Sequence, residues 1–386
     1  MKFSLKFALA LCLIASLASL AGVFAQTSNI NSVTSPTTNN LNSVFLVNNI
    51  TATNNDLTEL DAWAVGDSGT ILRWNGNTWS TVTSPTSMNL YSVFFVNSSW
   101  GWAVGGTSTN GVILQYNGSW STYTNVTFSG YPNATDTINA TLYSVTMGDN
   151  GTAGWAVGAG GAALMYSAGA WYGMNTSTSN ILRSVGMIHN ANDAWAVGDK
   201  GTIIQWTGIA WQNLTSPTTM NLNTIEMVNA SVAWAGGGTT DNGIIAMMNG
   251  TNWSIYNRIN MGGALNTTVG YNTDTLNATV NSISMDTASS AWAVGGKGMV
   301  LYFNGTEWQG ALNVAGTGTL KSVSMVHGTS NGSLQAWAVG DTGGIFAFNG
   351  TKWVPELPIM AIPLLMSIGL AVALLGKAKM ARKRVF

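Results

Sequence analysis

The chain has 386 residues, of which only 8% are charged, and its formal net charge at pH 7 is −1. Soluble domains usually carry about a quarter of charged residues, so this composition excludes a protein built from exposed amphipathic helices. Gly, Asn, Thr and Ser take the place of the charges, and 17 Trp residues lie among them. Aromatic residues spaced between Gly- and Asn-rich turns predict an all-β protein with many short strands.

The N-terminus has the pattern of a signal peptide, residues 1–25. Lys2 and Lys6 precede an apolar run from Phe7 to Leu20, and Val23-Phe24-Ala25 provides small residues for cleavage after Ala25. An uncleaved N-terminal anchor is the alternative. The only cysteine, Cys12, lies inside this segment, so we expect a mature protein without disulfides.

One short phrase recurs seven times between residues 26 and 354, the region that we assign to the folded domain. Its first copy is Ala62-Trp63-Ala64-Val65-Gly66, and each copy is followed after 16, 18 or 19 residues by a second Trp. The first tryptophans are Trp63, Trp102, Trp155, Trp195, Trp234, Trp292 and Trp337. The second are Trp79, Trp120, Trp171, Trp211, Trp253, Trp308 and Trp353. Fourteen of the 17 tryptophans therefore belong to a structural repeat.

Each repeat predicts four antiparallel strands. In the first copy, Leu41-Asn42-Ser43-Val44 is the first strand, the Ala-Trp phrase the second, residues 69–74 the third, and Trp79 begins the fourth. Gly and Asn between them tolerate the positive φ of tight turns. A lone four-stranded sheet with two apolar faces cannot bury itself, whereas seven packed around an axis bury every face. We predict a seven-bladed β-propeller with roughly 47 residues per blade; a solenoid is the rival architecture.

The repeats also indicate how the ring closes. Trp63 to Trp195 and Trp102 to Trp234 are both 132 residues, which indicates duplication of a three-blade block. Thr-Ser-Pro-Thr follows the fourth strands of the first and fourth copies and also occurs at residues 34–37. By register, Ile30–Val33 should then be the fourth strand of the last blade.

Two insertions follow the second and fifth copies, at Tyr123–Ala140 and Ile255–Thr279. Loops on a rigid scaffold often carry binding function, so these Thr- and Asn-rich segments are candidate contact surfaces. Trp100 and Tyr131 are candidate aromatic contacts, although packing at the core or rim is the alternative for both.

Phrases such as Trp195-Ala196-Val197-Gly198-Asp199-Lys200-Gly201-Thr202 resemble the repeats of photosystem II assembly and stability factor propellers, which also occur in extracellular proteins. The Asn-Gly-x-x-Trp turns are similar to the Asp-box turn of sialidase-type propellers, but they lack its Asp and its Gly-x-Thr. In that family the turn is structural. The resemblance implies the fold and leaves the function open.

We assign no catalytic, cofactor-binding or metal site. A sialidase-like site would need three clustered arginines, yet Arg73, Arg183 and Arg258 lie in different parts of the repeats. None of the four glutamates falls in a recognisable catalytic setting. His189 and His327 follow first strands, where a loop position is favoured over a metal ligand. The aspartates of three Gly-Asp-x-Gly turns are better explained by turn formation than by calcium binding; they are Asp67, Asp199 and Asp341.

Seventeen Asn-x-Ser/Thr sequons fit an N-glycosylated exterior, with ordinary Asn-rich turns as the alternative. They are Asn49, Asn97, Asn117, Asn125, Asn133, Asn139, Asn150, Asn175, Asn213, Asn229, Asn249, Asn252, Asn266, Asn277, Asn304, Asn331 and Asn349.

The C-terminus predicts a single transmembrane anchor, residues 355–376, whose uncharged core is Ile359–Leu375. Five basic residues in the tail 377–386 would stay in the cytoplasm by the positive-inside rule. Val354-Pro355-Glu356-Leu357-Pro358 and the segments after it resemble PEF-type sorting signals of archaeal surface proteins, with Leu357 where Phe is usual. That resemblance implies a sorting peptidase that removes the helix.

Seven of the 14 basic residues lie in these two ends, so residues 26–357 carry a net charge of about −8. Nucleic-acid binding needs a basic patch, and we expect none. The sequence favours a non-enzymatic propeller for recognition, adhesion or scaffolding on the extracellular face of the plasma membrane, with an unknown protein or glycan partner. An extracellular glycan hydrolase and an assembly factor for a membrane complex are the alternatives.

Overall fold

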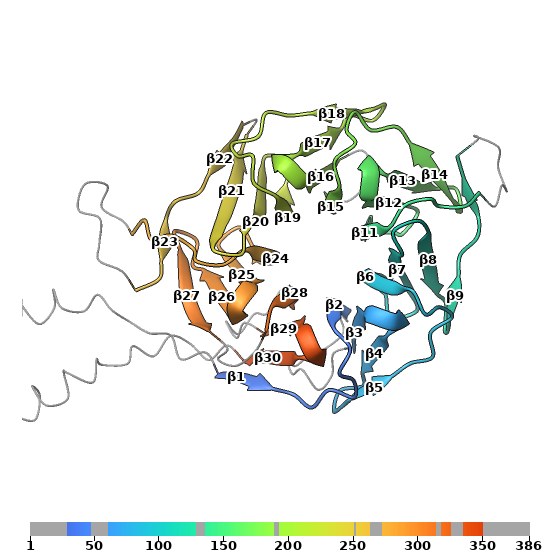
Figure 1. The fold of residues 1–386 in the computed structure, drawn as a ribbon, viewed down its shortest axis with the longest axis horizontal. Coiled ribbons are helices and arrows are strands. Elements are labelled where there is room, and N and C mark those ends of the chain that lie inside the picture. Colours follow the sequence, from blue (N-terminus) through green and yellow to red (C-terminus); the bar gives the residue numbers. More distant parts are fainter. Residues whose placement is uncertain are drawn as a thin grey trace, which may run out of the picture. The chain divides into compact units, whose positions relative to one another are not determined.

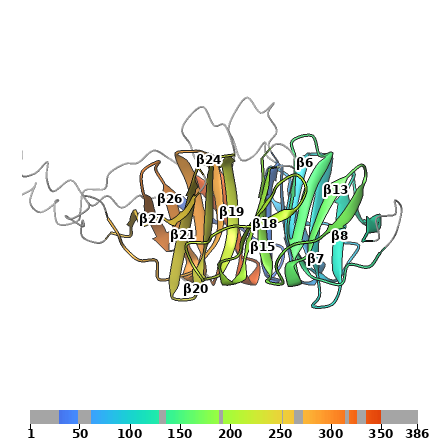
Figure 2. The same ribbon diagram turned by 90° about the horizontal axis from the view of Figure 1, so that it is seen from above.

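A computed structural model describes residues 29–47, 61–128, 136–188, 193–250, 252–262, 272–313, 318–325 and 335–349 of the chain. Seven sheets stand around a central axis (Figure 1). The side view shows that their strands run along that axis (Figure 2). The predicted seven-bladed β-propeller with four antiparallel strands per blade is confirmed.

The strands follow one another outward from the channel in every blade. Blade 1 consists of β2 (Leu41–Val47), β3 (Asp61–Gly66), β4 (Ile71–Trp74) and β5 (Trp79–Thr81). Blade 2 consists of β6 (Asn89–Asn97), β7 (Trp100–Gly106), β8 (Gly111–Tyr116) and β9 (Trp120–Thr122). Blade 3 consists of β11 (Leu142–Met147), β12 (Ala153–Gly158), β13 (Ala163–Ser167) and β14 (Ala170–Met174). Blades 4 and 5 consist of β15 (Leu182–Met187), β16 (Ala194–Gly198), β17 (Ile203–Trp206), β18 (Trp211–Asn213); and β19 (Leu222–Asn229), β20 (Val232–Thr239), β21 (Asn242–Asn249), β22 (Asn252–Ile255). Blades 6 and 7 consist of β24 (Val280–Thr287), β25 (Ser290–Gly295), β26 (Met299–Phe303), β27 (Trp308–Asn313); and β28 (Leu320–Met325), β29 (Gln335–Gly340), β30 (Ile345–Asn349), β1 (Asn29–Ser32).

The Gly-Asp-x-Gly phrases form short 3-10 turns between the second and third strands. In blade 1, Ser68 and Gly69 have φ values of 56° and 72°. A Cβ atom at Gly69 would lie 1.9 Å from the carbonyl oxygen of Thr86, which belongs to the segment that leads into the next blade. Glycine is required there because the backbone of the neighbouring blade packs directly on the turn.

The N-terminal strand completes the last blade. β1 pairs antiparallel with β30, and Ile30 lies opposite Phe348 (Figure 1). The prediction that Ile30–Val33 closes the ring is confirmed, with the strand one residue earlier than expected and Val33 donating its backbone N–H to the carbonyl oxygen of Ile345. Two distant parts of the chain therefore share one sheet.

Each of the two insertions contributes a short fifth strand, which the sequence did not predict. β10 (Val126–Thr127) pairs in parallel with β14, and β23 (Ile259–Asn260) pairs in parallel with β27. Buried Ile138 and Leu276 fix the later parts of the insertions against blades. The described parts of both insertions therefore dock on the ring instead of projecting from it.

The repeated tryptophans pack between blades. The first Trp of one blade meets the second Trp of the next blade, with centroid distances of 4.7–6.1 Å and interplanar angles of 61–89°. Edge-to-face contacts of this kind add stabilisation beyond the burial of area. In the seventh junction Trp292 stacks on Phe348 of the next blade, with ring centroids 5.1 Å apart. The second Trp of that blade, Trp353, lies outside the described residues.

No helix in the described part of the chain is long and apolar enough to span a bilayer. The predicted signal peptide and the predicted anchor Ile359–Leu375 lie outside the described residues.

Candidate functional site

The first strands of the seven blades line the channel and are linked by a closed set of hydrogen bonds. In each Leu-x-Ser-Val run, the hydroxyl of the Ser or Thr accepts the backbone N–H of the next blade's Val or Ile at 3.1–3.3 Å. The pairs are Ser43 to Val93, Ser92 to Val145, Ser144 to Val185, Ser184 to Ile225, Thr224 to Ile283, Ser282 to Val323 and Ser322 to Val44. This hydroxyl ring explains why every repeat keeps a small hydroxyl residue at that position.

The residue x before each hydroxyl lies at one mouth of the channel, around a hollow of about 610 Å³. The seven x residues, which we call the mouth ring, are Asn42, Tyr91, Tyr143, Arg183, Asn223, Asn281 and Lys321. Leu, Ser and Val recur beside them with few changes, whereas x is polar, aromatic or charged and differs from blade to blade. The repeats therefore have a constant frame and a variable ring.

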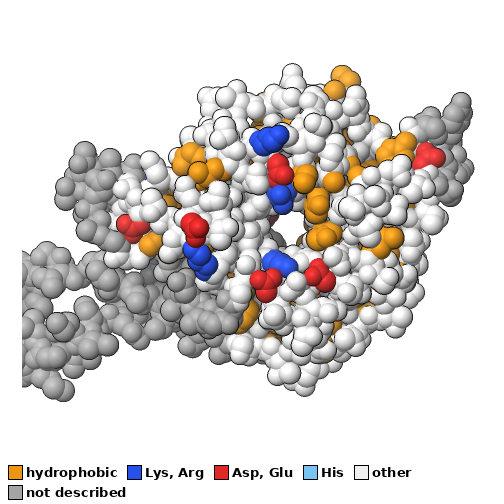
Figure 3. All heavy atoms as spheres, in the orientation of Figure 1, with side chains coloured by type: hydrophobic (Ala, Val, Ile, Leu, Met, Phe, Trp, Pro, Cys, Tyr) orange, Lys and Arg blue, Asp and Glu red, His pale blue; other side chains and the backbone are white. Residues whose placement is uncertain are grey.

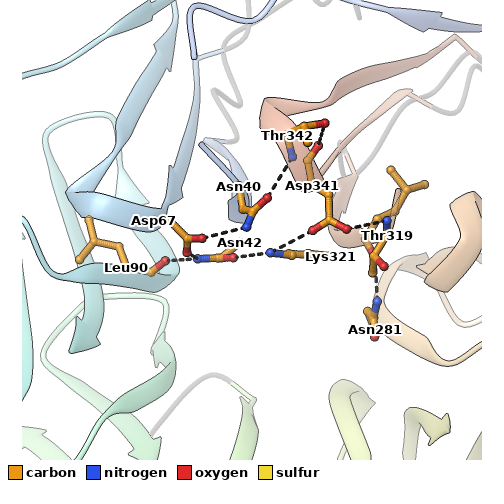
Figure 4. Close-up of polar contacts among 10 residues, drawn as sticks. Asn40, Asn42, Asp67, Leu90, Asn281, Thr319, Lys321, Asp341 and Thr342 are labelled. Carbon is orange, nitrogen blue, oxygen red and sulfur yellow. Dashed lines mark hydrogen bonds and ion pairs between the residues drawn. The ribbon is translucent and has the colours of Figure 1, made fainter. Parts of the chain in front are cut away.

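The aspartates of the 3-10 turns hold mouth-ring side chains of their own blades. Asp67 accepts a hydrogen bond from the amide of Asn42 at 2.9 Å, and Asp199 forms an ion pair with Arg183. Asp341 lies 3.3 Å from the Nζ of Lys321, as Figure 4 shows. These aspartates therefore form the expected turns and also position mouth-ring side chains.

The asparagines of the mouth ring connect neighbouring blades. Asn42 donates to the carbonyl oxygen of Leu90 at 2.9 Å, and Asn281 donates in the same way to Leu320 (Figure 4). Asn223 donates to the carbonyl oxygen of Val280 at 3.1 Å. A β-bulge interrupts the ladder after each of these Leu or Val residues, so the amides bind the neighbouring blade where its ladder is irregular.

The remaining mouth-ring residues give the hollow two unlike sides. Tyr91 and Tyr143 lie together with ring centroids 5.1 Å apart. Arg183 and Lys321 retain 34% and 27% exposure despite their aspartate partners. Figure 3 shows the hollow with hydrophobic side chains on one side and charged groups above and below it. The mouth presents fixed donors and acceptors beside an aromatic surface.

Deeper in the channel, the positions two residues after the hydroxyl ring line a cavity of about 540 Å³. These residues, which we call the inner ring, are Phe45, Phe94, Thr146, Gly186, Glu226, Ser284 and Ser324. Burial raises the pKa of Glu226 to about 7, although a hydrogen bond from the backbone of Met285 acts in the opposite direction. No catalytic motif contains Glu226, yet it is the only charged residue at this repeat position.

No family model and no curated protein matches the chain. Among solved structures, YCF48 bound to D1 peptide has a TM-score of 0.57 at 16% identity and covers 85% of this chain and 100% of its own. YCF48 from Cyanidioschyzon merolae gives 0.55 at 16% identity, with coverage of 83% and 98%. The WD40 β-propeller domain of Doa1 gives 0.59 at 13% identity, with coverage of 84% and 99%. These likenesses establish the fold alone.

The three arginines considered for a sialidase-like site lie on separate parts of the ring. Arg73 is on β4, pairs with Asp61 at 2.8 Å and lies over the ring of Trp63. Arg183 belongs to the mouth ring, and Arg258 lies between β22 and β23. The structure therefore does not bring them together.

Other candidate residues of the sequence fall in two groups. His189, His327, Tyr131 and Trp353 lie outside the described residues. Trp100 packs against the core of blades 2 and 3 and against Gly151, whose Cβ would lie 2.4 Å from its ring. Over the described ranges, no three His, Cys, Asp or Glu side chains gather where they could hold a metal ion.

Most described sequons present an exposed Asn. The exposed ones are Asn97, Asn117, Asn139, Asn150, Asn175, Asn213, Asn229, Asn249, Asn252, Asn277 and Asn304. Asn125 differs, because its Nδ2 donates to the carbonyl oxygen of Gly169 at 2.8 Å and its Oδ1 is buried. The side chains of Asn49, Asn133, Asn266, Asn331 and Asn349 are outside the described set.

Proposed function

We propose that the chain is a non-catalytic binding module, displayed outside the cell and tethered by its C-terminal segment, which recognises a protein segment at the mouth ring. The observation that carries this proposal is the contrast between the constant Leu-x-Ser-Val frame and the variable residues at x. Identical residues at x would suffice for a purely structural ring. Different residues at seven equivalent positions make a surface that can distinguish one ligand from others.

The chemistry of the mouth ring suits an extended polypeptide. Backbone amides and carbonyls need donors and acceptors at fixed positions, and the pairs Arg183–Asp199 and Lys321–Asp341 provide both. Tyr91 and Tyr143 offer an apolar surface for a side chain. The hydrogen bonds that hold these groups reduce the entropy lost on binding. The fold likeness to YCF48, whose solved structure includes a D1 peptide, supports the choice of a protein partner.

The extracellular location rests on the two ends of the sequence and on the exposed sequons. A signal peptide at 1–25 and a basic tail after Ile359–Leu375 would place the propeller outside the membrane. Protease treatment of intact cells should then degrade the propeller, while cells lysed before treatment lose the tail as well. Protection of the propeller in intact cells would contradict this part of the proposal.

Affinity purification of the detergent-solubilised chain from its native membranes tests the binding function. We expect a protein partner that is retained by the wild-type chain and lost with the double variant Y91A/Y143A and with R183A. The matched control is R73A, because Arg73 is also paired with an aspartate of its own blade but lies on β4, away from the mouth.

The outcomes separate three interpretations. Loss of the partner with the mouth variants and retention with R73A support the proposal. Equal retention by all variants would show that the partner binds elsewhere. Binding of the wild-type chain to a glycan array, with loss in the mouth variants and no protein partner, would assign the mouth to a carbohydrate and overturn the choice of a polypeptide.

A further inference from the structure

The inner ring has an acidic side and an aromatic side, and these two sides face each other across the channel. The first strands contact one another in the closed order β2, β6, β11, β15, β19, β24, β28. Glu226 is on β19 of blade 5, while Phe45 and Phe94 are on β2 and β6 of blades 1 and 2. Two blades separate the carboxylate from the phenylalanines in either direction around the ring, so Glu226 lies opposite them.

The two phenylalanines form one aromatic surface at the wall of the cavity. Their ring centroids are 4.8 Å apart, and both side chains are half-buried. Apolar residues are ordinary in a core, but these line a cavity of about 540 Å³ together with a carboxylate and the hydroxyls of Ser284 and Ser324. The combination of aromatic faces and a carboxylate is the chemistry that recognises ammonium groups.

The carboxylate at position 226 is not needed to join blades 5 and 6. In the next two junctions, Ser284 accepts the N–H of Met325 at 3.2 Å and Ser324 accepts the N–H of Leu46 at 3.1 Å. Glu226 accepts from the backbone of Met285 at the equivalent place. A serine there would make the same bond without the cost of placing a charge in a confined channel.

No positive side chain lies among the described residues that line this cavity, and Asp149 is the second acidic residue there. Among the described residues, this cavity therefore combines acidic groups with aromatic rings. We propose that the inner ring is a binding site for an organic ammonium group, with Glu226 as the ionic partner and Phe45 and Phe94 as the cation–π surface. This assignment is independent of the proposed recognition at the mouth ring.

The ammonium group can belong to a small free amine or to a lysine side chain that enters the channel, and titration calorimetry on the full-length chain distinguishes the two. The chain is purified in a nonionic detergent and titrated at pH 8, where Glu226 is largely ionised. The probes are choline, methylammonium and a short peptide with one lysine. Binding of choline or methylammonium indicates a free amine, whereas binding of the peptide alone indicates a protein side chain.

Variants of the inner ring test the roles of its residues. E226Q keeps the shape of the side chain and should weaken binding at least about tenfold, because it removes the charged partner. F45L and F94L should each weaken binding about two- to fivefold, as expected for loss of one aromatic face. The matched control is E307Q, which removes one carboxylate from the outer strand region of blade 6 and should leave binding unchanged.

Thermal melts of all four variants establish that each is folded before its affinity is compared, and E226Q alone decides the question if a Phe variant unfolds. The proposal is overturned if no probe binds at millimolar concentration, or if E226Q binds as tightly as the wild-type chain. The proposal is also overturned if sodium ions compete with the ammonium probes as well as the probes compete with one another, and if F45L and F94L have no effect on binding. A simple counter-ion site would then explain the cavity.

Discussion

Trp337 of the last blade meets Trp79 of the first edge to face, with ring centroids 5.3 Å apart and planes at 89°. This contact is made between residues 258 positions apart in the chain. It has the same geometry as the contacts between consecutive blades, which shows that the closing junction is packed like the others.

Replacement of Trp337 by Ala should lower the free energy of unfolding by about 3–5 kcal/mol, because the side chain is 1% exposed and its removal leaves a cavity. Chemical denaturation measures the change. W100A is the control, because Trp100 is half-buried at the rim. Its replacement should lower the free energy of unfolding clearly less than W337A does. Equal losses for the two variants would contradict the assignment of Trp337 to the junction.

Removal of residues 1–38 should destabilise the ring more than removal of residues 1–27. The longer deletion eliminates β1 and leaves the edge of β30 unpaired. The melting temperature should fall by about 5 °C or more relative to the shorter deletion, and the exposed strand edge should promote association. Light scattering and thermal melts at equal concentration measure both effects; identical behaviour of the two chains would show that β1 does not close the ring.

The stability gained by E226Q should depend on pH. The pKa of Glu226 is raised from about 4.5 to about 7, so the folded chain binds the proton more tightly than the unfolded chain does. Folding is therefore increasingly opposed as the pH rises from about 4.5 through 7. E226Q should raise the free energy of unfolding by about 1–2 kcal/mol at pH 8, after allowance for partial exposure, and by little at pH 4.5. The same gain at both values would exclude a perturbed carboxyl.

Asn125 should remain unglycosylated while Asn97 and Asn117 carry glycans. The nitrogen to which a glycan is attached donates to Gly169 in Asn125, whereas the other two side chains are exposed. Glycopeptide mass spectrometry of the chain from its native source measures occupancy at the three sites. A glycan on Asn125 would require this hydrogen bond to be absent when the sugar is attached.

Much of the fold was predictable because each repeat contains local sequence patterns that locate its strands. The Ala-Trp phrase locates the second strand, and the Thr-Ser-Pro-Thr at residues 34–37 fixes the register that makes β1 part of blade 7. Both are local patterns repeated many times. The short strands β10 and β23 were missed, because two residues do not produce a detectable alternation.

The sites were harder to predict because they come from side chains that the ring brings together from different blades. Arg183 and Lys321 are three blades apart in the chain, yet they share one hollow. Glu226 stands in no catalytic motif, and its raised pKa results from burial, which the sequence alone does not show. An alignment of the seven repeats would have detected it, since the equivalent positions are aromatic, hydroxyl or glycine residues.

The pairing of β1 with β30 also decides how the ring would bear mechanical load. β30 is hydrogen-bonded on one edge to β29 and on the other to β1. Tension applied to the polypeptide beyond Asn349 would enter the ring at this strand and not at a free edge. Two ladders would have to rupture before the strand could be pulled out, so β30 would resist extraction under such tension.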